Sequence, residues 1–96
     1  FNFMIKKDIA EIKALEALVW LSKNQELLRD FMEQSGGTVT DIFESAKDPQ
    51  FLMFVVEYCL TADEIALECA KALKIKPEEL KEILIMLPGS ETYNWT

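Results

Sequence analysis

Apolar residues recur every three or four positions along almost the whole chain, which is the period of an amphipathic α-helix. The first such segment predicts a helix from Ile5 to about Leu21, with apolar positions at Ile5, Ile9, Ile12, Leu15, Leu18 and Val19. Ser22 and Asn24 are candidate caps for a second helix, because their side chains accept hydrogen bonds from free backbone N–H groups. Gly36-Gly37 ends this helix, and its inward stripe is Leu27, Leu28, Phe31 and Met32.

Helix-start signals predict two further helices in the middle of the chain. Thr38 with Asp41 three residues later resembles a capping box and opens a short helix that runs to about Ala46. Asp48-Pro49 combines a carboxylate cap with a proline in the first turn, and it opens a helix from Pro49 to Leu60. This helix is apolar almost all round, with only Gln50 and Glu57 polar, so we expect it in the middle of a bundle.

The last third of the chain predicts two more helices. Thr61 and Glu64 form a capping-box pair at the start of a helix that runs to about Leu73. Lys76-Pro77-Glu78-Glu79 opens the final helix, which ends at Pro88-Gly89 and has the buried stripe Leu80, Ile83, Leu84 and Leu87. We therefore expect an all-α fold, a single compact bundle of five or six helices over residues 1–96. Residues 1–4 form an N-terminal extension and residues 89–96 a C-terminal tail in this prediction.

The two halves of the chain are weakly similar at an offset of about 38 residues. Leu27 corresponds to Ile65, Phe31 to Cys69, and Ile42 to Leu80. The bundle can therefore consist of two pseudo-repeated three-helix units, although chance similarity between amphipathic helices explains so few matches equally well.

Charge and composition exclude several classes of function. The chain has 17 acidic and 10 basic residues, a formal net charge of −7 and no histidine. This charge repels phosphate backbones and anionic lipids, so we expect no nucleic-acid partner and no membrane partner. Without histidine the commonest general base and metal ligand are missing, and we expect no catalytic residue, no metal and no cofactor. No apolar run approaches the ~20 residues of a spanning helix, which predicts a cytoplasmic protein.

Three stretches carry a resemblance to a known family. They are ALEALVWLSKNQELLRDFMEQSG from Ala14, DPQFLMFVVEYCLTADEIALECAKALKIKPEEL from Asp48, and LPGSETYNWT at the end. Together they resemble a family of small, all-helical bacterial proteins of unknown function, over nearly the whole chain from about Ile9. The resemblance implies the helical fold and implies no role for any residue.

A few residues are candidates for chemistry or binding. Cys59 and Cys69 lack a metal-ligand spacing, and the turn at Leu60 is expected to keep them too far apart to bridge, so we interpret them as buried free thiols. Glu57 is the only charge in the apolar fourth helix. It is a buried functional carboxylate, a marker of that helix's exposed strip, or the partner of a lysine across the bundle. Tyr93 and Trp95 in the tail dock either on the protein's own core or on a partner.

Three hypotheses of function remain from the sequence. The leading one is a protein-protein interaction or adaptor module with an apolar patch and an acidic rim, with Glu57, Tyr93 and Trp95 as possible interaction residues. The alternative is a pocket that binds an apolar small molecule. An enzyme or a DNA-binding protein is the least favoured, because no nucleophile–base motif is present and the segment most like a helix-turn-helix, from Thr61 onward, is too acidic for DNA.

Overall fold

A computed structural model of the chain describes residues 6–87. The predicted N-terminal extension and C-terminal tail, with Tyr93 and Trp95, lie outside these residues. Within them the chain forms six helices: α1 (Lys7–Ser22), α2 (Gln25–Ser35), α3 (Val39–Ser45), α4 (Pro49–Cys59), α5 (Asp63–Leu73) and α6 (Glu79–Met86). The predicted all-α fold is confirmed.

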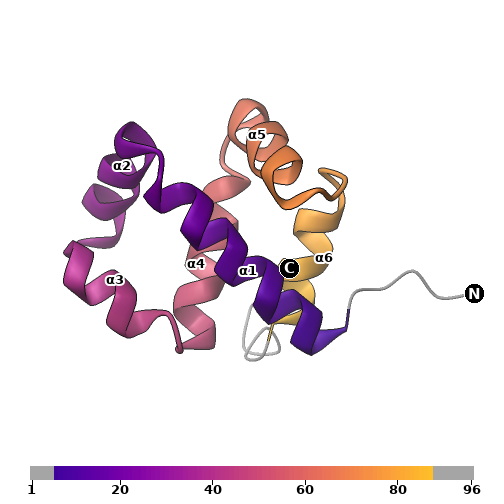
Figure 1. Cartoon of the computed structure of the whole chain (residues 1–96), viewed down its shortest axis with the longest axis horizontal. Coiled ribbons are helices and arrows are strands. Elements are labelled where there is room, and N and C mark those ends of the chain that lie inside the picture. Colours follow the sequence, from indigo (N-terminus) through magenta and orange to yellow (C-terminus); the bar gives the residue numbers. More distant parts are fainter. Residues whose placement is uncertain (1–5, 88–96) are drawn as a thin grey trace, which may run out of the picture.

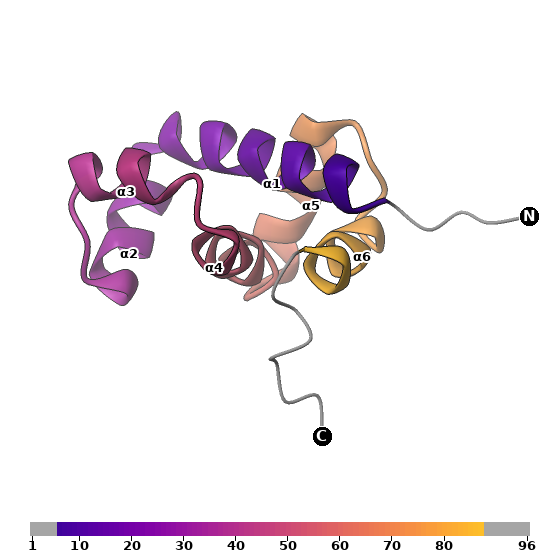
Figure 2. The ribbon, with the colours of Figure 1, turned by 90° about the horizontal axis from the view of Figure 1, so that it is seen from below.

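Helices α1 and α4 together form the centre of the bundle. α1 crosses α4 and also packs against α2, α5 and α6 (Figure 1). Turned on its side, the molecule shows α1 along its upper edge, with α4 and α6 beneath it (Figure 2). The apolar fourth helix is central as expected, and its buried residues are Leu52, Met53, Val55, Val56, Tyr58 and Cys59.

The side of α1 that packs on α4 and its neighbours is made largely of small residues. Ala10, Ala14 and Ala17 are completely buried, and Leu18 and Leu21 complete this face. Small side chains let two helix backbones approach closely, since little volume separates them. Of the apolar positions predicted for this helix Leu18 is buried, whereas Ile9, Ile12, Leu15 and Val19 are exposed. Helix α1 is therefore apolar on two faces, and only one of them is covered by the described part of the chain.

Local start and stop signals explain three helix boundaries, whereas Asn24, an expected cap of α2, makes no side-chain hydrogen bond to the first turn of that helix. The Asp48 carboxylate accepts a hydrogen bond from the Gln50 N–H at 3.0 Å, directly before Pro49 in the first turn of α4. The Thr38 hydroxyl accepts from the Asp41 N–H at 3.2 Å, and the Asp41 carboxylate accepts from the Thr38 N–H at 3.1 Å, so this capping box is confirmed. Gly36 ends α2 in a left-handed conformation (φ 76°) that a glycine adopts without steric cost.

Two boundaries differ from the prediction. The capping box at Thr61 and Glu64 is wrong: Ala62 stands at the start of α5, and the Thr61 hydroxyl instead donates to the Tyr58 carbonyl at 2.6 Å. Helix α5 ends at Leu73 as expected, and the residue that follows it, Lys74, is a non-glycine with a left-handed backbone (φ 59°). Helix α6 begins at Glu79, two residues after Pro77, and the Glu79 carboxylate accepts a hydrogen bond from the Lys76 N–H at 3.2 Å across the preceding turn.

The weak internal similarity is consistent with how residues are buried. Phe31 and Cys69 are both buried, and so are Ile42 and Leu80. In each half a short helix comes third, α3 with 7 residues and α6 with 8. The predicted stripe of α6 is fully confirmed, since Leu80, Ile83, Leu84 and Leu87 all belong to the core.

Candidate functional site

Glu57 lies on the solvent-facing strip of α4. It follows Gln50 and the exposed Phe54 along one side of that helix, and it is half-buried. This placement agrees with the simpler interpretation, in which the residue marks the exposed strip. Glu57 also lines a surface groove of about 380 Å³ between α2 and α4, together with Phe31, Gln34, Ser35, Phe54, Tyr58 and Thr61.

The floor of this groove is a cluster of aromatic rings. Phe31 makes edge-to-face contacts with Tyr58 at 5.4 Å and with Phe51 at 5.9 Å between ring centroids. The Tyr58 hydroxyl donates to the Asp30 carboxylate at 2.7 Å, and Asp30 also accepts from Gln34 at 3.2 Å. Burial, and then the hydrogen bond to Asp30, raises the pKa of Tyr58 from 10.0 to about 12. The phenol is thus a neutral structural donor that ties α4 to α2.

The second surface feature is the outer face of α1. Ile12 and Val19 are more than half exposed, at 54% and 53%, and Ile9 and Leu15 stand beside them at 44% and 40%. A groove of about 460 Å³ runs along this face toward α5, and its lining residues are Ile12, Leu15, Glu16, Val19, Trp20, Lys23, Ala72 and Leu73. We call the exposed side chains Ile9, Ile12, Leu15 and Val19 the α1 outer stripe.

Lys13 joins the two helices that border this groove. Its ammonium group donates to the Leu73 carbonyl at 3.1 Å, at the C-terminal end of α5, and to the Glu16 carboxylate at the same distance. A cation at the C-terminal end of a helix is favoured by the helix dipole. Lys13 therefore fixes α1, which carries the stripe, against the end of α5, and this contact positions the two helices that line the groove.

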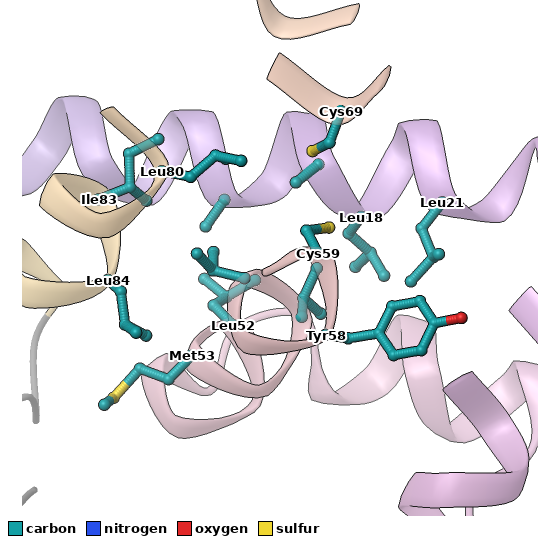
Figure 3. Close-up of a cluster of buried hydrophobic side chains, with 14 of the residues drawn as sticks. Leu18, Leu21, Leu52, Met53, Tyr58, Cys59, Cys69, Leu80, Ile83 and Leu84 are labelled. Atoms are coloured by element: carbon teal, nitrogen blue, oxygen red, sulfur yellow. The ribbon is translucent and has the colours of Figure 1, made fainter. Parts of the chain in front are cut away.

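The two cysteines meet in the core between α4 and α5. Figure 3 shows both thiols directed toward one another among buried leucine side chains. They are free and buried, as expected, and a hydrogen bond links the two thiols without a disulfide between them. The hydrogen bond with Cys69, and then burial, raises the pKa of the Cys59 thiol well above its usual range. A neutral buried thiol is a poor nucleophile, and the pair belongs to the packing of the core.

The described residues provide neither a metal site nor a membrane-spanning helix. Residues 6–87 contain no group of three or more cysteine and acidic side chains that is placed to hold a metal ion. None of the six described helices combines the length and the apolar character needed to cross a membrane. The predicted roles of Tyr93 and Trp95 fall outside these residues and stay predictions.

Comparison with known proteins gives a match to a protein family. A family model described as "Protein of unknown function (DUF3572)" matches residues 7–90. The chain belongs to this family. The resemblance to an all-helical family of unknown function is thereby confirmed, and the DUF3572 match spans all six helices that the structure describes. No curated protein and no solved structure matches the chain.

Proposed function

We propose that this protein is a cytoplasmic protein-protein interaction module, without enzymatic activity, that docks its partner on the α1 outer stripe. The observation that carries this proposal is the second apolar face of α1. Four large side chains in one contiguous row are exposed on a helix that already buries its alanine face in the core. Isolated exposed apolar residues are ordinary, whereas a contiguous row on a rigid element marks an interaction site.

The energetics of the stripe agree with this function. Burying a Val, Leu or Ile side chain is worth roughly 1.5–3 kcal/mol relative to leaving it exposed. A partner that buries the stripe therefore gains favourable free energy of binding from apolar side chains that folding of the described chain leaves exposed. Asp8 and Glu16 stand beside it as exposed acidic groups, which supply the polar rim typical of interfaces.

The groove between α2 and α4 supports a second candidate, the binding of an apolar small molecule. Its volume of about 380 Å³ lies within the range of ligand pockets, roughly 300–1,000 Å³. However, Phe31 and Tyr58 are only 2% and 4% exposed, so their rings are already occupied by the core and by each other. Native mass spectrometry of the purified protein distinguishes the two candidates, because a retained ligand adds a fixed mass.

The interaction function is tested with one disruptive variant and one matched control. Ile12→Glu places a charge in the middle of the stripe, and Leu67→Glu places the same charge at an equally exposed apolar residue of α5 outside it. A partner identified by affinity capture is purified and titrated against each variant. We expect at least a tenfold loss of affinity for Ile12→Glu and little change for Leu67→Glu. Equal affinities for the two variants would refute docking on the stripe.

A further inference from the structure

The outward side of α1 carries a symmetric pattern of charge and apolar residues. Asp8, Ile12, Val19 and Lys23 follow one another at spacings of four, seven and four residues, and all four are exposed. Because 3.6 residues make one helical turn, these spacings place the four side chains along one line of the helix. The line begins with a negative charge, ends with a positive charge, and has its midpoint between Leu15 and Glu16.

This pattern is complementary to itself when the helix is turned end to end. In an antiparallel pair related by a two-fold axis, each residue faces the one equally far beyond the midpoint in the other helix. Asp8 then faces Lys23 of the second copy, and Lys23 faces Asp8 of the second copy. Ile12 faces Val19 of the second copy in the same way, and the two copies of Leu15 meet beside the axis.

We propose that the occupant of the α1 outer stripe is a second copy of this chain, paired through α1 in this antiparallel register. The inference rests on the proposed function, since it names the partner of the same surface. Two ion pairs close the ends of an apolar seam about 22 Å long, at 1.5 Å per residue. The two copies of Glu16 approach each other beside the axis, and each is already paired with its own Lys13 at 3.1 Å.

Charge selects this register over the alternatives. A parallel pairing brings Asp8 onto Asp8 and Lys23 onto Lys23, and like charges in contact are unfavourable. An antiparallel pairing shifted by one turn places Asp8 opposite Val19 and leaves both charges without partners across the seam. Each chain also carries a net charge of −7, so the two copies repel at long range and only the local pairs orient them.

The experiment is a charge swap read by analytical ultracentrifugation over a wide concentration range. The wild-type chain is expected to shift toward twice the monomer mass of 11.0 kDa as its concentration rises. Asp8→Lys and Lys23→Asp each place like charges at both ends of the seam, and each should weaken association at least tenfold. The double variant Asp8→Lys/Lys23→Asp reverses every pair and should restore association.

Mixing the two single variants gives the sharpest outcome. Asp8→Lys presents two lysines and Lys23→Asp presents two aspartates, so the mixture should form a mixed dimer although neither variant associates well alone. Net charge alone predicts a different result for the single variants. Asp8→Lys makes the chain less negative and should then associate more readily, whereas Lys23→Asp makes it more negative and should associate less readily. Thermal melts by circular dichroism show whether each variant is folded before its mass is interpreted.

A cross-link tests the axis independently of charge. In the proposed register L15C lies beside its own copy and should form an intermolecular disulfide with oxidised glutathione, which is reduced as the bond forms. E26C, on the exposed side of α2, is the control and should not cross-link efficiently. A wild-type chain that stays monomeric at every concentration would overturn the dimer, as would a mixture of single variants that fails to associate. In that event the proposed function still stands if Ile12→Glu abolishes binding of a different partner, and it fails with the dimer if Ile12→Glu changes nothing.

Discussion

Replacing Tyr58 with phenylalanine isolates one partly buried hydrogen bond between two helices. The change removes only the hydroxyl that donates to Asp30 at 2.7 Å, and the ring keeps its edge-to-face contact with Phe31. Hydrogen bonds to charged groups contribute about 1.5–3 kcal/mol, but Asp30 is exposed and water replaces the lost donor. We expect the variant to be about 1 kcal/mol less stable at pH 7, a fall of about 4–8 °C in Tm for a chain of this size.

The same hydroxyl predicts a pH dependence with a definite sign. The unfolded chain releases the Tyr58 proton near pH 10, whereas the folded chain holds it until its pKa of about 12. The stabilisation is therefore complete below pH 10 and is lost as pH rises from 10 to 12, by at most about 1.4 kcal/mol per pH unit. Because Tyr58→Phe has no such proton, the stability difference between wild type and variant should shrink above pH 10 and reverse before pH 12.

Urea unfolding followed by circular dichroism, repeated between pH 7 and pH 12, measures both effects. All other titratable groups are common to both proteins and cancel in the difference. A double-mutant cycle with Asp30→Ala should return a coupling of about 1 kcal/mol between the two side chains. The reasoning is refuted by a variant as stable as wild type at pH 7, or by a difference that stays constant to pH 12.

Five further substitutions test the fold, four of them arranged as two matched pairs. Val56→Ala, at a fully buried site, should cost about 2–3 kcal/mol in the free energy of unfolding. Val19→Ala on the outer stripe should change it by less than about 0.5 kcal/mol, and urea midpoints compare the two. Thr38→Ala, which breaks a real capping box, should cost about 1 kcal/mol, whereas Thr61→Ala should cost clearly less, because its hydroxyl caps no N–H group. Lys74→Gly should raise stability by about 0.5–1 kcal/mol, since glycine adopts the left-handed conformation at the end of α5 without strain; a lower thermal midpoint would contradict that explanation.

Features that depend on neighbouring residues in the chain could be predicted from the sequence. The Asp48-Pro49 start of α4 and the glycine end of α2 are local, because cap and helix are adjacent in the chain. The buried stripe of α6 follows from its helical period alone. Thr61 shows the limit of such signals, since its hydroxyl has a closer acceptor in the last turn of α4, the carbonyl of Tyr58.

Features that depend on two distant segments could not be predicted in this way. The hydrogen bond from Tyr58 to Asp30 joins residues 28 positions apart, and no local sequence pattern around either residue predicts the other as its partner. The contact between Cys59 and Cys69 depends on the angle at which α4 packs against α5. That angle cannot be derived from the spacing of the two residues along the chain. The sequence marks Glu57 as the only charge in α4, but its place beside a groove depends on how α2 packs against α4.

Helix α1 shows why the candidate interaction surface was hidden in the sequence. A period of three to four residues identifies a helix, but when both faces are apolar it does not say which one is buried. Here the alanine face is buried, because small side chains allow α1 to lie close against α4, and the bulkier residues are left outside. Alanines bury little apolar area, so α1 is held by close contact more than by large side chains. A partner that covers the outer stripe would supply the apolar burial that this central helix lacks, and binding and folding stability would then be linked by mass action.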